Sequence, residues 1–172
     1  TWLREYIFSY FENIEHFSYS SVTKVPYDFL TKNIIKKPYS STAMDFGTNV
    51  HNALEKIVLD KAKLEDYTDE DELKAIKNGL KRLEEIKKEN PGFKIKTSEM
   101  KVKLSMKLLT EYSQEDSLTF EGKIDAVFEH DDGIFLIDYK TDKNANYASH
   151  HKRQLAVYKK IYSQLENIPE EK

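Results

Sequence analysis

The hydrophobic pattern of this chain changes its period at the Asn-Pro-Gly sequence of residues 90–92, and this change restricts the folds it can adopt. Before that point, residues 43–63 and 71–89 place apolar side chains at the i, i+3, i+4 and i+7 spacing of amphipathic helices. After it, residues 98–109 alternate apolar and polar side chains, which is typical of a half-exposed antiparallel strand. The chain therefore predicts a helical part followed by a sheet.

Two more strands and a closing helix complete this sheet-forming part. Strands are predicted over residues 118–129 and 133–139, because Asp131-Asp132-Gly133 between them is a hairpin turn signal. The second strand is apolar on both faces, which predicts a central position in the sheet. A helix is predicted over residues 147–165. Helices, then strands, then a helix indicate an α/β (α+β) fold.

The N-terminal residues give weaker signals. The aromatic-rich residues 2–17 fit a helix or a docking segment, and no clean period decides between the two. Serine hydroxyls in N-cap positions predict a helix over residues 21–33, and residues 36–42 read as a loop. Acidic residues 66–72 predict a loop or a helix cap.

Composition excludes several classes of protein. The 172 residues suggest one domain, and the absence of cysteine excludes disulfides, thiolate zinc sites and iron–sulfur clusters. A net charge of −3 does not describe a globally basic nucleic-acid binder, although local positive patches remain compatible with one. Without a signal peptide or an apolar run of roughly 20 residues, we expect a cytoplasmic protein with no membrane partner. The chain starts without methionine, and we expect a fragment of a longer protein.

Two acids and a lysine carry the chemistry. Asp138 and Lys140 are two residues apart, so in a strand both project from one face, and Asp125 on the preceding strand can reach the same place. Two carboxylates beside an ammonium group make a site for a divalent cation with a charged helper. The structural alternative is an ion pair at a strand end, which is the commoner role of an isolated Asp-x-Lys.

Four motifs together resemble a known family. They are Gly-Lys-Ile-Asp at residues 122–125, Ile-Asp-Tyr-Lys-Thr-Asp at 137–142, Gln154-x-x-x-Tyr158, and Gly47-x-x-x-His51. Their order and spacing over residues 18–160 resemble the RecB-type branch of the PD-(D/E)XK nucleases. This resemblance implies a restriction-endonuclease-like core, with a mixed central sheet flanked by helices. Residues 43–166 would form this catalytic core, preceded by an N-terminal helical segment over residues 1–42, within a single domain over residues 1–172.

The resemblance also implies a role for each motif residue. Metal binding is implied for the side chains of His51, Asp125 and Asp138, and for the backbone carbonyl of Tyr139. Lys140 would orient the attacking water and stabilise charge, so that Asp125, Asp138 and Lys140 are the catalytic group. Residues that would line the site or contact DNA complete the set: Gln154, Tyr158, Thr141 and Arg153, with Glu99 close to the site.

The roles implied for His51, Gln154 and Tyr158 each have a structural alternative. A histidine among apolar neighbours on a helix is more often a core residue, but Gly47 one turn earlier permits close approach of the helix to the sheet. One imidazole among carboxylate oxygens suits Mg²⁺ or Mn²⁺. Gln154 and Tyr158 project side by side from one helical turn, and a buried tyrosine beside a surface glutamine is their structural alternative.

The function implied by the resemblance is that of a metal-dependent DNA nuclease. It would act on single strands or duplex ends in DNA repair or recombination, with a UvrD-type helicase in the same chain or complex. The missing cysteines point to the members without an iron–sulfur cluster. Two alternatives stay open: a catalytically inactive nucleic-acid-binding domain with the same fold, and a nuclease acting on RNA or branched DNA.

Overall fold

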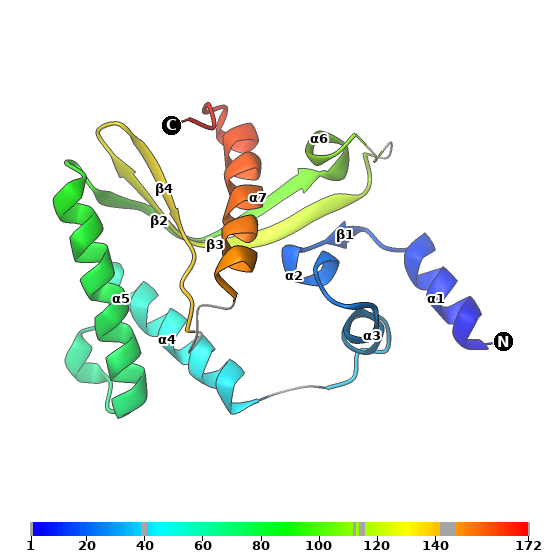
Figure 1. The fold of residues 1–172 in the computed structure, drawn as a ribbon, viewed down its shortest axis with the longest axis horizontal. Helices are drawn as coiled ribbons and strands as arrows, with labels where there is room; N and C mark the ends of the chain where they lie inside the picture. Colours follow the sequence, from blue (N-terminus) through cyan, green and yellow to red (C-terminus); the bar gives the residue numbers. More distant parts are fainter. Residues whose placement is uncertain (1, 39–40, 112, 114–115, 142–146, 172) are drawn as a thin grey trace.

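The fold is built from seven helices, two short helical turns and four strands in the part of the chain described by a computed structural model, residues 2–38, 41–111, 113, 116–141 and 147–171. Figure 1 shows helices α4 (Thr42–Val58) and α5 (Glu70–Glu89) on one side of the sheet and α7 (Ala148–Glu166) crossing its other side. Helices α1 (Trp2–Glu12) and α3 (Pro26–Phe29) extend away from this body, whereas α2 (Tyr19–Val22) contributes the buried Tyr19 to it. The α/β fold with helices flanking a mixed sheet agrees with the expectation from the sequence.

The two amphipathic helices form where the sequence predicts them. Helix α4 spans Thr42–Val58 and helix α5 spans Glu70–Glu89. The Ser41 side chain accepts a hydrogen bond from the Met44 N–H and caps α4, as the Asp69 side chain does for α5 with the Glu72 N–H. The expected end of α4 at residue 63 is wrong, because Asp60 adopts a left-handed φ of 55°. A 3₁₀ turn over Leu64–Asp66, η2, leads into α5.

The strands form where apolar and polar residues alternate in the sequence, but their first and last residues differ from the predicted ones. Strand β2 spans Lys94–Ser105, starting earlier than expected, and Met106–Leu109 forms the one-turn helix α6 instead of continuing the strand. The Ser105 hydroxyl accepts a hydrogen bond from the Lys107 N–H, which favours the helical turn. Strand β3 spans Thr119–His130 and β4 spans Gly133–Ile137, and the expected hairpin turn between them consists of Asp131 and Asp132.

The sheet is mixed. Strand β3 pairs antiparallel with β2 and β4, and its start pairs in parallel with a two-residue strand β1, His16–Phe17, which the sequence did not reveal. The expected central position of β4 is wrong, since within the described residues β4 pairs only with β3. Its side chains are half-buried because layers cover both faces of the sheet.

Residues before α4 form several short helices. Helix α1, Trp2–Glu12, has no buried residue, and Tyr10, Phe11 and Phe29 form an aromatic contact between it and α3. The single helix expected over residues 21–33 is wrong. Pro26, whose fixed φ suits a first helical position, starts a new helix. The result is α2 (Tyr19–Val22), α3 (Pro26–Phe29) and the π-helical turn η1 (Leu30–Ile34).

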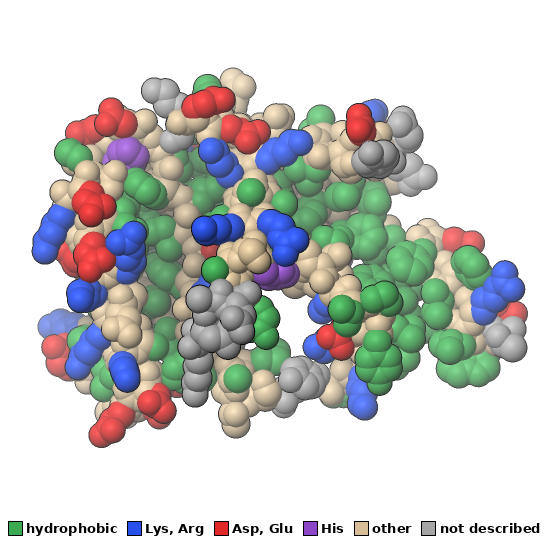
Figure 2. Space-filling view, in the orientation of Figure 1, with side chains coloured by type: hydrophobic (Ala, Val, Ile, Leu, Met, Phe, Trp, Pro, Cys, Tyr) green, Lys and Arg blue, Asp and Glu red, His purple; other side chains and the backbone are tan. Residues whose placement is uncertain are grey.

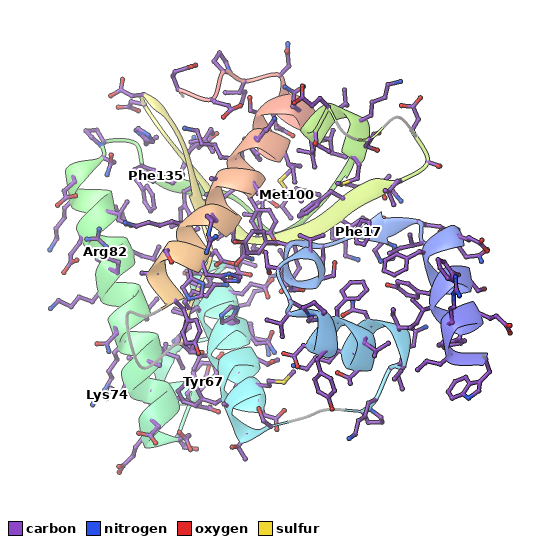
Figure 3. All side chains as sticks on the ribbon, turned by 45° about the vertical axis from the view of Figure 1, so that its right-hand side comes forward. Phe17, Tyr67, Lys74, Arg82, Met100 and Phe135 are labelled. Atoms are coloured by element: carbon purple, nitrogen blue, oxygen red, sulfur yellow. The ribbon has the colours of Figure 1, made fainter. Side chains whose placement is uncertain are left out.

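Two apolar clusters hold the layers together. One lies between the sheet and α7, Ala148–Glu166, and includes Ile124, Val127 and Ile161. The other joins the opposite face to α4 and α5 through Leu54, Ile76 and other buried residues. Figure 3 shows Met100 beside α7 and Phe135 on the side of α5, in keeping with their packing against the first and second cluster respectively. No helix among the described residues is long and apolar enough to span a bilayer.

Candidate active site

The site begins at an irregularity in strand β3. Ile124 and Val127 belong to the cluster under α7, whereas Ala126 and Phe128 belong to the cluster under α4 and α5. Because alternate residues of a regular strand share one face, β3 must switch phase between Ile124 and Ala126. Asp125 lies at this switch. The irregular backbone gives its carboxylate an orientation that a regular strand would not provide.

The neighbouring strand is irregular at the same level. In the register of β2 with β3, Ser98 lies opposite Ala126 and Met100 lies opposite Ile124, which leaves Glu99 and Asp125 between these pairs. Glu99 has a left-handed φ of 48°, which is costly for a residue other than glycine. Its carboxylate turns to Lys123, with Oε1 of Glu99 2.5 Å from Nζ of Lys123. The hydrogen bond to Glu99 is the main cause that raises the pKa of Lys123, and the negative charge of Glu99 adds to this effect.

Asp125 is held by two partners. Its Oδ2 accepts a hydrogen bond of 2.7 Å from the Tyr139 backbone N–H and lies 3.4 Å from Nδ1 of His51. The side chain of Asp125 is 14% exposed, and burial is the main cause that raises its pKa. The negative charge of Asp138 raises this pKa further, while His51, the Tyr139 hydrogen bond and Lys140 lower it.

His51 approaches Asp125 from helix α4. Val50 and Leu54 on the same helix are buried, which fixes the side of α4 that faces the sheet. A Cβ placed on Gly47 would lie 3.2 Å from Oγ1 of Thr141, so this glycine permits the close contact between α4 and the segment that follows β4. The His51 ring also meets the Tyr139 ring edge-on, with centroids 5.9 Å apart.

Asp138 and Lys140 follow the end of β4. Their side chains meet, as the two-residue spacing predicts, with Oδ2 of Asp138 2.5 Å from Nζ of Lys140. The Asp138 side chain is 5% exposed and that of Lys140 is 31% exposed. The expected strand over residues 133–139 is too long at its end, because β4 stops at Ile137 and the Tyr139 N–H bonds Asp125 instead of a neighbouring strand.

Helix α7 contributes the last two motif residues that the structure brings to this place. Gln154 donates from Nε2 to Oδ1 of Asp138 over 3.5 Å and to Oη of Tyr158 over 3.3 Å. Tyr158 is 5% exposed and belongs to the cluster between α7 and the sheet. Asp138 is therefore contacted through one oxygen by Gln154 and through the other by Lys140.

The other expected site residues lie around this centre in different ways. Thr141 packs against α4 at Gly47, and Glu99 pairs with Lys123. Arg153 is exposed on α7, where its Nε donates to the Ser149 carbonyl, so the described contacts do not join it to the acids. Figure 2 shows Lys and Arg side chains and a histidine over the first turns of α7. Asp142 lies outside the described residues.

Two residues near the site received no role from the sequence. Glu55 lies one turn after His51, and its Oε1 accepts a hydrogen bond of 3.2 Å from the Ser98 hydroxyl. Burial raises the pKa of Tyr139, and the charges of Asp125 and Glu55 add to this effect. The four-residue spacing of His51 and Glu55 was the available signal. Gly122 is the other residue, and its Cβ would collide with the ring of Tyr158.

The ligand atoms at this site are of the kinds that a hard divalent cation prefers, but the side chains that carry them are not gathered closely around one point. Carboxylate oxygens and one imidazole are suitable ligands for Mg²⁺ or Mn²⁺. The buried Oδ2 of Asp138 has no partner among the described residues other than Nζ of Lys140, and because a carboxylate oxygen has two lone pairs, it retains capacity for a ligand. However, no group of three or more His, Cys, Asp or Glu side chains in the described part of the chain is close enough to hold an ion.

The described geometry can be compared with known proteins. The family model for the PD-(D/E)XK nuclease superfamily matches residues 16–172, which include every strand and the helices that carry the site. A search of curated proteins finds no match. A match over this much of the chain supports a nuclease activity that depends on divalent metal ions. The chain thus belongs to the PD-(D/E)XK nuclease superfamily.

Proposed function

We propose that this chain is a cytoplasmic, Mg²⁺- or Mn²⁺-dependent deoxyribonuclease of the RecB type, without an iron–sulfur cluster. Its substrates would be single-stranded DNA or duplex ends, in repair or recombination, with a helicase in the same chain or complex. The observation that carries the proposal is the meeting of Lys140 with the buried Asp138, beside Asp125. Buried charges of this kind are costly in a structural role and useful in a catalytic one.

The metal would be held by the side chains of His51, Asp125 and Asp138 and by the backbone carbonyl of Tyr139. When bound, the ion supplies positive charge at the scissile phosphate and lowers the pKa of a water molecule. Lys140 is the partly exposed member of the group and carries an ammonium group with three donors. It can hold the attacking water and stabilise the negative charge that develops on the phosphate.

A cleavage assay tests this proposal. Wild-type protein should cut labelled single-stranded or duplex DNA with Mg²⁺ or Mn²⁺, and chelation by EDTA should stop the reaction. Asp138→Asn should abolish cleavage, and Lys140→Met should lower it by about 100- to 1000-fold, because each removes a charge at the reacting phosphate. Asp132→Asn is the matched control, because Asp132 is exposed in the β3–β4 turn. This variant should cleave DNA at the wild-type rate. Full activity of Asp138→Asn would contradict the proposal.

The inactive nucleic-acid-binding domain is the second candidate, and the lack of a three-ligand cluster among the described residues favours it. Calorimetric titration of the wild-type protein with Mn²⁺ separates the two. Saturable binding that Asp138→Asn removes supports the nuclease. DNA binding without Mn²⁺ binding and without cleavage supports the inactive domain. Parallel assays on single-stranded RNA and branched DNA decide the substrate.

A further inference from the structure

Tyr158 occupies a place that strand β3 leaves open for it. A Cβ added to Gly122 would lie 2.7 Å from Cε1 and 3.0 Å from Oη of Tyr158. Both distances are shorter than ordinary carbon contacts, so any larger residue at position 122 would displace the ring. The missing side chain of Gly122 therefore leaves a gap on the surface of β3, here called the notch, which the hydroxyl end of the Tyr158 ring fills. Tyr158 is 5% exposed, and this burial keeps its ring away from direct contact with a substrate.

The side-chain amide of Gln154 lies between the hydroxyl of Tyr158 and the carboxylate of Asp138. The amide nitrogen of a glutamine carries two hydrogens, and here Nε2 faces Oη of Tyr158 at 3.3 Å and Oδ1 of Asp138 at 3.5 Å. The opposite amide orientation would place the Gln154 oxygen against the carboxylate, where it cannot donate. The carboxylate of Asp138 thus selects the amide orientation, and the Tyr158 hydroxyl holds the amide in place by accepting from the same nitrogen.

We propose that Tyr158 is a positioning residue for the reaction, acting through Gln154 on the carboxylate of Asp138, with Gly122 as the notch that seats it. This inference rests on the proposed nuclease function for its kinetic consequence, but not for its structural one. Gln154 and Lys140 each hold one oxygen of Asp138, so loss of the Gln154 contact frees the carboxylate to rotate. Long hydrogen bonds such as that of Gln154 commonly shorten when substrate and metal are bound.

The chain offers a matched control one turn further along α7. Tyr162 is 4% exposed and belongs to the same apolar cluster as Tyr158. Its Oη accepts a hydrogen bond of 2.9 Å from Nζ of Lys96, on β2. Replacing either tyrosine by phenylalanine removes one buried hydroxyl and keeps the ring. The two variants therefore differ in whether the hydroxyl faces Gln154.

The first measurement needs no activity. In ¹⁵N spectra of metal-free protein, the Gln154 side-chain amide pair is assigned by its disappearance in Gln154→Ala. We expect Tyr158→Phe to shift this pair and Tyr162→Phe to leave it unchanged. Gly122→Ala should reproduce the shift, because the added methyl group displaces the tyrosine ring. An unshifted Gln154 pair in Tyr158→Phe would overturn the inference, whether or not Gly122→Ala folds.

The second measurement is kinetic, with DNA as substrate and Mn²⁺ present. Tyr158→Phe should lower kcat by about 10- to 100-fold with KM unchanged, as expected for loss of a residue that orients a ligand. Tyr162→Phe should keep the kcat of wild type. Equal losses in both variants, or a higher KM with unchanged kcat in Tyr158→Phe, would overturn the positioning role. If wild-type protein cleaves nothing, the nuclease proposal fails, and the amide spectra alone decide the contact.

Discussion

The ladder between β2 and β3 has a regular half and an irregular half, and the two treat charge differently. In the regular half, residues 100–105 pair with 119–124 without interruption. The charged side chains there remain near water, as in the ion pair of Lys103 with Glu121, whose side chains are 65% and 37% exposed. The irregular half contains a register shift between Ile95 and Thr97 and the left-handed Glu99.

Aspartate side chains are buried beside the irregular half. Next to it, the side chains of Asp125 and Asp138 are 14% and 5% exposed. Regular alternation sends one set of side chains to the core and the other to solvent, so it cannot easily bury a charge next to other charges. A phase switch exchanges the faces of all residues that follow it, and it gives the residue at the switch, here Asp125, an orientation of its own. The comparison indicates that the backbone irregularity, as much as the residue types, creates the candidate site.

The largest expected difference concerns two lysines, Lys140 next to the irregular half and Lys103 in the regular half. Lys140→Met keeps the aliphatic stem but leaves the Asp138 carboxylate buried without its cation. We expect the free energy of unfolding to fall by about 1–3 kcal/mol, the usual cost of depriving a buried acceptor of its partner. Lys103→Met should leave the unfolding free energy at the wild-type value, since its ion pair is solvated. Urea denaturation of metal-free protein measures both.

One result for Lys140→Met would contradict this expectation. If Lys140→Met and Lys103→Met are equally stable, the Asp138 charge is compensated by solvent or by other groups. The Asp138–Lys140 contact would then resemble an ordinary surface ion pair, and the proposed catalytic role would lose its physical support.

Backbone strain gives the next effect in size. Glu99→Gly and Glu99→Ala both remove the contact with Lys123, but only glycine adopts a φ of 48° without cost. We expect the glycine variant to be more stable than the alanine variant by about 1 kcal/mol. At Lys101, which pairs with Lys123 in the regular half, the order should reverse by about 0.5–1 kcal/mol. Thermal unfolding of the four variants checks this reversal, and the same order at both positions would contradict it.

The sequence predicts those parts of the fold that depend on local pattern. Helix α5 lies within one residue of its expected range, and the turn at Asp131 and Asp132 forms as expected, because apolar period and turn residues act locally. Strand β1 could not be predicted, since two residues have no period and gain their structure only from β3. The edge position of β4 was missed because layers on both faces, and not strands on both sides, make it apolar.

Within the site, sequence reading shows which residues meet but not how they are held. The pairing of Gln154 with Tyr158 follows from one helical turn. The contact of Asp138 with Lys140 was expected from strand spacing, but it forms beyond the end of β4. The roles of Gly122 and Glu55 depend on how α7 and α4 approach the sheet, which no local pattern encodes. The assignment of metal ligands stays a prediction.

The smallest expected effect is a gain of stability at the site itself. Because burial raises the pKa of Asp125, folding disfavours its ionised form, and the protein loses stability as pH rises through the folded pKa. Below the ordinary pKa of an aspartate both states are protonated and this cost vanishes. Asp125→Asn should therefore be more stable than wild type at pH 7 in EDTA, by a margin that disappears as the solution is acidified. Its amide oxygen can still accept a hydrogen bond from the Tyr139 N–H.

Urea titrations between pH 4 and pH 8 measure the stability difference between Asp125→Asn and wild type. A less stable Asn variant at pH 7 would mean that attraction to His51 and Lys140 outweighs burial, and that the irregular half of the ladder stabilises its charges as well as the regular half does.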